Sequence, residues 1–393
     1  MSFVQQSPYD VAIVGARCAG AFLATLLARA GLSVVVLDKA PAGTDTLSTH
    51  ALMRGGVIQL ARHGLLEAVV AAGTPAVRET TFVYGDETVT VPMKPQAGTD
   101  ALYAPRRTVL DPILQDAARD AGARLLFGHL VTGVTRAPSG RVDGLVARGP
   151  AGEAVRIAAD LVVGADGVRS RLARDVGART LRTSAAATAT VFAYLPGVTG
   201  PGYRWHFAPG AAAGLIPTND AALLLATTSA ARFQGELGGD PARAFPALLA
   251  ELSPDYGALV AAAGMQGKLR AFGGIAGHLR QSFGPGWALV GDAGFFRDPL
   301  TAHGITDALV HADLLAEAIL GGGGPAPMRR FQEARDALAL PILAATEAIA
   351  GFVWDLDEIQ AHHAALNRAM KAENAVLAAR APLPTPAPLR MSA

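Results

Sequence analysis

The chain has 393 residues, of which 51% are hydrophobic and 17% are charged. This composition excludes an intrinsically disordered chain, which combines low hydrophobicity with a high net charge. The 34 basic and 33 acidic residues leave a net charge of +1, so we expect no nucleic acid partner. The single cysteine excludes a disulfide framework and a multi-cysteine metal site, and we predict no bound metal.

The mean hydropathy of +0.30 makes a membrane protein worth testing. A spanning helix needs about 20 mainly apolar residues. The uncharged stretch of residues 183–203 is interrupted by threonine, proline and glycine, and acidic or basic residues interrupt the other apolar runs. Because no basic region followed by an apolar stretch opens the chain, no secretory signal is predicted. We therefore expect no transmembrane segment and a cytoplasmic protein.

The N-terminal part alternates strand, turn, helix and strand within about 30 residues, the length of a βαβ unit. Residues 9–14 read as a buried strand that Gly15 ends, and residues 21–29 have helical spacing that Gly31 stops. Residues 33–37 form a second strand, closed by Asp38. This order predicts a parallel sheet.

Further helices are predicted at residues 57–72 and 108–121, short strands near residues 81–91, and a buried strand at residues 159–164. From residue 183 to about residue 284, strands alternate with glycine and proline turns, and one helix covers residues 242–252. This change of pattern indicates a separate module. A buried strand returns at residues 287–290, and a long helix begins near Gly304.

The last part of the chain is predicted to be helical. The run Gly321–Gly324, followed by Pro325 and Pro327, reads as a hinge, and residues 329–379 as helix with a break at Pro341. His362 and His363 are expected on a solvated face. Four prolines at alternate positions predict a disordered tail from residue 381.

The turn after the first strand carries the first chemical signal, Gly15-Ala16-Arg17-Cys18-Ala19-Gly20. Between a strand and a helix, a G-x-G-x-x-G pattern is typical of dinucleotide binding. Gly15 permits the tight turn, Gly20 permits close packing of the helix, and the helix N-terminus offers N–H groups to a pyrophosphate. Arg17 replaces the middle glycine, so its side chain must avoid the phosphates or bind them through its charge.

The end of the second strand refines this prediction. Asp38, followed by Lys39, suits a ribose 2′-hydroxyl and argues against a 2′-phosphate. The turn is therefore predicted to hold an ADP moiety, as in FAD or NAD. Cys18 has no partner cysteine for disulfide chemistry and is interpreted as a small residue in a tight turn.

Two later segments extend the pattern. Residues 161–170 place Gly164-Ala165-Asp166-Gly167 after a buried strand. Residues 289–305 end a strand on Gly291-Asp292 and lead through Pro299 and His303 into a helix at Gly304-Ile305. An aspartate at a strand end suits a sugar or ribityl hydroxyl, and the helix N-terminus would stabilise negative charge on a reduced flavin ring.

These three segments, in this order and spacing, resemble the FAD-dependent oxidoreductases of the p-hydroxybenzoate hydroxylase superfamily. The resemblance covers roughly residues 9–320. It implies an α/β fold with a Rossmann-like FAD-binding domain, split in sequence, and an inserted mixed β-sheet substrate domain. The expected division is residues 1–80, 100–182 and 285–325 for the FAD domain, 81–99 and 183–284 for the substrate domain, 326–380 for C-terminal helices and 381–393 for the tail.

The resemblance also implies roles for single residues. Arg107 matches an arginine that contacts the FAD phosphate or ribityl region, and Arg54 resembles another near the pyrophosphate. Val131 lies on the strand that meets the adenine, and Asp166 belongs to a motif near the pyrophosphate. The predicted cofactor-binding residues are Gly15, Arg17, Cys18, Ala19, Gly20, Asp38, Lys39, Arg54, Arg107, Val131, Asp166, Gly291, Asp292, Pro299, Gly304 and Ile305.

The substrate site is predicted from aromatic and histidine residues. A strand that alternates Tyr203, Trp205 and Phe207 puts three aromatic rings on one face, which suits either a pocket wall or hydrophobic core. Phe295 and Phe296 are expected to line the pocket beside the ring. His303 is expected to hydrogen-bond the flavin N1/O2 edge or to donate a proton, and His50 is the second catalytic candidate.

For the chemistry, the resemblance implies a monooxygenase. NADH or NADPH would reduce the flavin, O2 would form a flavin C4a-hydroperoxide, and one oxygen atom would enter a small apolar or aromatic substrate. The alternative is a geranylgeranyl-reductase-type double-bond reductase, because residues 299–305 are similar to the P-L-T-G-E-G-I segment of that branch. The three tryptophans form no W-x-W-x-I-P halogenase motif. A non-catalytic flavin-binding protein is a further option. The role of the C-terminal helical segment is open: residues 329–379 either pack on the FAD domain or join two copies in a homodimer.

Overall fold

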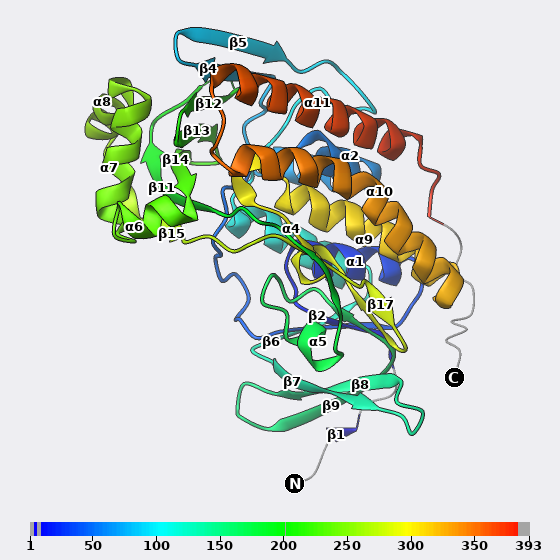
Figure 1. Cartoon of the computed structure of the whole chain (residues 1–393). Coiled ribbons are helices and arrows are strands. Elements are labelled where there is room, and N and C mark those ends of the chain that lie inside the picture. Colours follow the sequence, from blue (N-terminus) through cyan, green and yellow to red (C-terminus); the bar gives the residue numbers. More distant parts are fainter. Residues whose placement is uncertain (1–3, 6–8, 201, 384–393) are drawn as a thin grey trace.

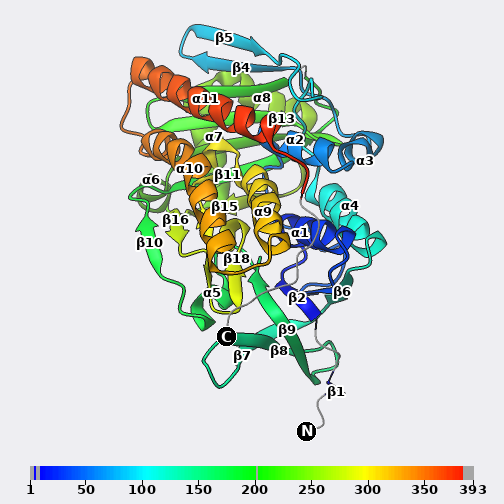
Figure 2. The ribbon, with the colours of Figure 1, turned by 90° about the vertical axis from the view of Figure 1, so that its right-hand side faces the viewer.

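The structure is a computed structural model that describes residues 4–5, 9–200 and 202–383. Figure 1 shows two sheets at opposite ends of the molecule, with long helices running alongside both. The chain crosses between the two ends several times, so segments far apart in sequence meet in space (Figure 2).

A nine-stranded sheet forms one end of the molecule, the lower end in Figure 1. Its parallel part has the order β18-β9-β2-β3-β6, and β17 pairs with β18 at one edge. Strand β9 also pairs with β1 and with the antiparallel strands β8 and β7. The bounds are β1 (Val4–Gln5), β2 (Tyr9–Val14), β3 (Val34–Asp38), β6 (Arg124–Phe127), β7 (Leu130–Arg136), β8 (Val142–Arg148), β9 (Ala154–Gly164), β17 (Phe283–Gly284) and β18 (Trp287–Leu289).

Both faces of the parallel part are covered. Val11 and Ile13 of β2 face a core with the helices α1 (Cys18–Arg29), α4 (Arg107–Asp120) and α9 (Gly304–Leu320). Ala12 and Val14 face the opposite way, into a core shared with β7, β8 and the helix α5 (Arg171–Asp175). A strand buried on both faces is apolar throughout, which is why residues 11–14 carry no polar side chain.

A seven-stranded sheet forms the other end, in the order β15-β11-β14-β13-β12-β4-β5. All its pairs are antiparallel except β4 with β12, so the sheet is mixed. The bounds are β4 (Glu79–Tyr84), β5 (Glu87–Pro92), β11 (Thr188–Pro196), β12 (Gly202–Ala208), β13 (Ala211–Pro217), β14 (Ala221–Ser229) and β15 (Gln266–Phe272). The predicted mixed α/β fold is confirmed.

Helices cover both faces of this second sheet. On one face lie α6 (Ala230–Gly235), α7 (Pro241–Leu252) and α8 (Pro254–Ala263) (Figure 1). The other face packs against the ends of α10 (Pro325–Ala350) and α11 (Leu356–Ala379). A small third sheet consists of β10 (Thr180–Thr183), β16 (His278–Arg280) and β19 (Phe295–Phe296). Along the chain, β10 and β16 lie where the chain passes from one large sheet to the other. No helix within the described residues is both long and apolar enough to cross a bilayer.

The structure corrects two of the predicted helices. The helix predicted at residues 57–72 is two helices, α2 (Arg54–Arg62) and α3 (Leu66–Ala71), because Gly64 adopts a positive φ of 69° that ends the first. Helix α10 does not break at Pro341. That proline faces solvent, while Ile342 and Leu343 are buried, so the packing of this helix continues past the missing hydrogen bond.

The tail beyond the last helix lies mostly outside the described residues. Of the predicted disordered segment 381–393, only residues 381–383 are described, and Leu383 packs against the core beside α1 and α2.

Helix α11 carries a buried carboxyl, Glu373, with only 4% of its surface exposed. Its Oε2 lies close to Gly55 of α2, where an added Cβ would be 3.1 Å from it. Burial, together with the nearby charge of Asp307, raises the pKa of Glu373 to about 7, although Arg297 opposes the shift. The folded protein therefore keeps a proton on Glu373 at pH values at which the unfolded chain has lost it.

This protonation predicts a pH-dependent stability. The contribution of Glu373 is present below its ordinary pKa of 4.5 and is lost as the pH rises through about 7. We expect Glu373→Gln to raise the free energy of unfolding by roughly 2–3 kcal/mol at about pH 8.5 and to change it little at about pH 4.5. Urea unfolding at several pH values measures this, with the exposed Glu333→Gln as control. Equal pH dependence in both variants would contradict the expectation.

Candidate functional site

The turn between β2 and α1 has the backbone that its sequence predicts. Gly15 has a φ of 104°, and a Cβ there would overlap the carbonyl oxygen of Ala165. A Cβ on Gly20 would overlap the carbonyl oxygen of Gly15. Both positions therefore require glycine, and the first turn of α1 lies directly over the end of β2.

Asp38, at the end of β3, faces this turn. Its two carboxylate oxygens accept hydrogen bonds from the backbone N–H groups of Ala16 and Ala40, both at 2.8 Å. Each oxygen keeps a second lone pair, so the carboxylate is held in place and is still able to accept from a ribose hydroxyl. Lys39 beside it is exposed.

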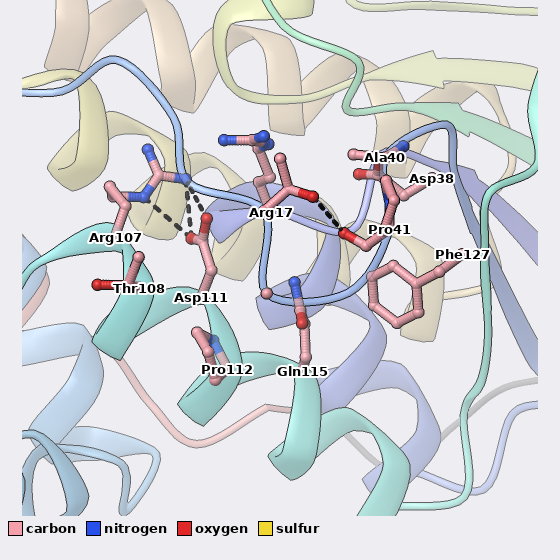
Figure 3. A pocket seen from close by; sticks show the side chains of 12 residues that line it. Arg17, Asp38, Ala40, Pro41, Arg107, Thr108, Asp111, Pro112, Gln115 and Phe127 are labelled. Atoms are coloured by element: carbon pink, nitrogen blue, oxygen red, sulfur yellow. Dashed lines mark hydrogen bonds and ion pairs between the residues drawn. The ribbon is translucent and has the colours of Figure 1, made fainter.

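A hollow opens between this turn and α4 (Figure 3). Arg17 lies between Asp38 on one side and the Arg107–Asp111 pair on the other. The Nη1 atom of Arg17 is buried and has no hydrogen-bond partner among the described residues. Gln115 closes the base by donating to the carbonyl oxygen of Ala16 at 2.9 Å. An unpaired guanidinium nitrogen beside a helix N-terminus suits an anionic group such as a pyrophosphate.

Arg107 and Asp111 form a buried pair one helical turn apart on α4. The guanidinium donates to both carboxylate oxygens at 2.8–3.0 Å, and the Sγ of Cys18 lies 3.4 Å from Asp111 Oδ1. Burial, with Asp111 nearby, raises the pKa of the Cys18 thiol well above its ordinary value, against the opposing charge of Arg107. Cys18 is therefore a neutral thiol and not a nucleophile.

The other two sequence fingerprints, residues 161–170 and 289–305, lie next to the first, the Gly15–Gly20 turn. The loop after β9 reaches Gly15 through Ala165, whose N–H donates to Val14. Gly291, in the 3₁₀ turn η1 (Gly291–Ala293), has a φ of 59°, and a Cβ there would lie 3.0 Å from Ala19. Burial, with Asp307 nearby, raises the pKa of the next residue, Asp292, to about 7, while Arg107 opposes the shift. The structure thus brings the three fingerprints together around one end of the parallel sheet.

The side chains of three predicted cofactor residues have their partners outside the hollow. Arg54 donates to the carbonyl and hydroxyl oxygens of Thr99 and does not line the hollow. Asp166 accepts from the Ser170 hydroxyl and from the backbone N–H groups at the start of α5, which makes it a helix cap. Val131 of β7 is buried in the core that also contains Ala12 and Val14 of β2.

The aromatic strand forms part of a closed apolar cluster. Tyr203, Trp205 and Phe207 are buried on one face of β12, together with Phe192 and Tyr194 of β11. The Tyr203 hydroxyl donates to the carbonyl oxygen of Tyr103 at 2.8 Å. The cluster, hereafter the aromatic cluster, also contains residues of α10 and α11 and two residues that adjoin the predicted histidines, Ala51 and Ala302.

The two phenylalanines after the third fingerprint do not share this cluster. Phe295 packs with Leu279, Ala339 and Leu343 in a separate small core, and its ring meets His311 edge-on at 5.6 Å. Phe296 contacts the rings of Phe272 and His278. Neither ring belongs to the aromatic cluster, because β19 pairs with β16 rather than with the seven-stranded sheet.

His50 and His303 border the aromatic cluster from two loops. His50 has a φ of 66°, and its Nε2 lies 2.6 Å from the Tyr194 hydroxyl. His303 precedes α9, and its Nδ1 lies 2.6 Å from the Thr301 carbonyl oxygen. Burial, helped by Arg106 near His50 and Arg297 near His303, lowers the pKa of each to about 3. Both imidazoles are therefore neutral at physiological pH.

Several contacts around the site are not predicted by the sequence. The Arg106 guanidinium carbon lies 3.4 Å from the Tyr194 ring centroid, a cation–π contact next to His50. Arg297 and Asp307 form a buried ion pair that spans the loop carrying His303. His363 is not solvated: its Nδ1 lies 2.8 Å from the Tyr84 hydroxyl and its ring stands 4.4 Å from that of Phe207. None of these pairings has a sequence signal, because the partners are distant in the chain or have no fixed spacing.

No group of three or more His, Cys, Asp or Glu side chains in the described part of the chain is arranged to hold a metal ion.

Comparisons with known proteins agree with this geometry. The model of the FAD binding domain family matches residues 8–346. Menaquinone reductase of Mycolicibacterium smegmatis is 31% identical over 337 residues, which are 80% of this chain and 77% of that protein. Digeranylgeranylglycerophospholipid reductase of Methanocella arvoryzae is 25% identical, over 85% of this chain and 84% of that protein.

Two solved structures share the fold. A flavin-dependent brominase superposes with a TM-score of 0.80 at 20% identity, over 95% of this chain and 93% of that chain. A probable FAD-dependent monooxygenase from Pseudomonas aeruginosa gives a TM-score of 0.75 at 21% identity, over 91% of this chain and 100% of that chain. The chain belongs to the FAD-binding domain family of the p-hydroxybenzoate hydroxylase type, and it is an FAD-dependent oxidoreductase.

Proposed function

We propose that the protein is a monooxygenase that uses NADH or NADPH and O2 to oxygenate a small apolar or aromatic substrate. FAD supplies the redox chemistry when bound. The observation that carries the proposal is the aromatic cluster, which contains Ala51 and Ala302, the chain neighbours of the two neutral histidines. An oxygenation whose reactive group is carried by the flavin needs a dry, shaped pocket from the protein and no strong acid or base.

The residues around the hollow fit FAD. Gly15 and Gly20 let the backbone and α1 approach the pyrophosphate, and the buried, unpaired Nη1 of Arg17 supplies a positive partner. Asp38 would accept a ribose hydroxyl, and Asp292 would meet the ribityl chain. The Arg107–Asp111 pair holds the wall of α4 in place and keeps the Arg107 charge close to the cofactor.

The substrate is proposed to lie against the aromatic cluster. Tyr203, Trp205 and Phe207 would offer ring faces and edges to an apolar or aromatic molecule. Helices α10 and α11 cover this face of the sheet and would exclude water from the reacting atoms. The neutral His50–Tyr194 pair would orient a polar group of the substrate without placing a charge in the pocket.

A second candidate is a double-bond reductase acting on a prenyl-type substrate. The identity of 31% to a menaquinone reductase over most of both chains favours it, whereas the solved monooxygenase and brominase, at about 20% identity, support the fold alone. The reductase would use the same apolar pocket but would transfer hydrogen to the substrate instead of oxygen.

Labelled oxygen distinguishes the two. We expect the FAD-loaded protein, given NADPH or NADH and a panel of small aromatic compounds under ¹⁸O₂, to release a product that carries one ¹⁸O atom, detected by mass spectrometry. The flavin-free protein is the control. A product that gains two hydrogen atoms under nitrogen, with no label under ¹⁸O₂, would establish the reductase and overturn the monooxygenase.

A further inference from the structure

The tautomer of His303 is fixed by the backbone carbonyl of Thr301, two residues earlier in the chain. Its Nδ1 lies 2.6 Å from the carbonyl oxygen of Thr301. A carbonyl oxygen only accepts hydrogen bonds, so Nδ1 must carry the proton and donate it. The imidazole is neutral, because burial and the nearby Arg297 lower its pKa to about 3. Its Nε2 therefore carries a lone pair and no proton.

This Nε2 atom is buried and lacks a partner. It has no hydrogen bond to any described residue, and only 1% of the His303 surface is exposed. A buried polar nitrogen without a partner costs about 1–3 kcal/mol, so the atom needs a donor that the protein itself does not provide. An N–H or O–H group on a bound molecule meets this need.

The position of His303 indicates which molecule. It is the residue before Gly304, where α9 begins, and a side chain on Gly304 would meet no atom within 4 Å. The first N–H groups of a helix have no partner within the helix, so this end of α9 offers donors next to one acceptor. The pyrimidine edge of an oxidised isoalloxazine has the matching pattern: acceptors at N1, O2 and O4, and one donor, N3–H.

We propose that Nε2 of His303 accepts a hydrogen bond from N3–H of the bound isoalloxazine ring, while backbone N–H groups at the N-terminus of α9 donate to the ring acceptors beside it. The inference rests on the proposed placement of FAD. It replaces the expectation that His303 donates a proton: a neutral imidazole whose only N–H is bound to Thr301 has none to give at Nε2. His303 is thus a cofactor-positioning acceptor.

Nitrogen NMR tests the tautomer directly. We would record long-range ¹H–¹⁵N spectra of the full chain labelled with ¹⁵N-histidine, and assign His303 by the loss of its signals in His303→Leu. We expect the flavin-free protein to show a protonated Nδ1 and an unprotonated Nε2 from about pH 5 to about pH 8. A protonated Nε2 would overturn the proposal.

Addition of FAD tests the partner. We expect the Nε2 signal of His303 to move towards the protonated value without gaining a proton, and the signals of His311, buried on the same helix with an unpartnered Nδ1, to stay in place. An unchanged Nε2 signal in a yellow, FAD-loaded protein would overturn the proposal and leave the proposed function standing. Failure to bind FAD would overturn both.

An analogue gives a second readout. FAD methylated at N3 has no donor at this point. We expect the wild-type protein to bind it about tenfold more weakly than FAD, and His303→Leu to bind the two flavins equally to within about twofold. Equal binding of both flavins by the wild-type protein would overturn the proposal.

Discussion

Gly20→Ala is expected to abolish FAD binding. The added Cβ would overlap the carbonyl oxygen of Gly15 and lie 3.2 Å from the side chain of Ala165. The first of these contacts is backbone, which has no rotamer to move away. Helix α1 would have to shift from the end of β2, and its N-terminus would leave the position that a pyrophosphate needs.

The expected size follows from overpacking. Forcing one extra carbon into a tight interior typically costs 1–3 kcal/mol, and here we expect about 3 kcal/mol and at least a 100-fold loss of FAD affinity. Flavin absorbance of the purified protein and urea unfolding measure the two effects. Gly257→Ala is the matched control, because Gly257 lies in helix α8 and its Cβ would meet no atom within 4 Å. A Gly20→Ala protein that purifies with full FAD would contradict the geometry described above.

The parts of the site that the sequence predicts are those with local causes. Gly15 and Gly20 are readable because a tight strand-to-helix turn excludes a Cβ at these points. The shared face of Tyr203, Trp205 and Phe207 is readable because side chains of a strand alternate. Their role as a pocket wall stays a prediction, since a period of two does not distinguish a wall from a core.

The parts that it does not predict depend on distant partners. Asp166 sits in a motif typical of cofactor binding, yet its carboxylate caps α5, and only the position of that helix decides this. The tautomer of His303 depends on a turn in which Ala302 has a φ of 56° and the Thr301 carbonyl oxygen faces Nδ1. Side-chain identity carries no information about either choice. For the same reason the prediction of a helix break at Pro341 is wrong. The packing of buried side chains that stabilises α10 on both sides of this proline is a property of the tertiary structure.

Arg297→Met is expected to destabilise the protein by about 3–5 kcal/mol. The guanidinium donates to both oxygens of Asp307, through Nε at 2.7 Å to Oδ2 and through Nη2 to Oδ1. Both side chains are almost fully buried. Without Arg297, the Asp307 carboxylate would remain buried near two further acids, Asp292 and Glu373, whose pKa values it already raises.

The loss should depend on pH. Burial raises the pKa of Asp307 above its ordinary value, although Arg297 opposes this shift, so removal of the arginine would raise it further. At about pH 4 Asp307 is then able to take up a proton and shed its unpaired charge. We therefore expect the destabilisation to be largest near pH 8 and to shrink on acidification. A constant loss across this range would show that packing against Phe295, and not charge, is what Arg297 supplies.

The double variant Arg297→Met/Asp307→Leu distinguishes two effects of the ion pair: its contribution to stability and its hold on the loop that it closes. It replaces a buried ion pair by apolar side chains, an exchange that is often neutral or stabilising, so we expect its free energy of unfolding to lie within about 1.5 kcal/mol of the wild type. The pair also closes the ten-residue span that holds the turn η2 (Pro299–Thr301) and His303. Because that loop would lose its clamp, we expect the double variant to fold but to bind FAD about tenfold more weakly. Wild-type FAD affinity in this stable variant would show that the pair serves the fold alone, and that α9 positions His303 without it.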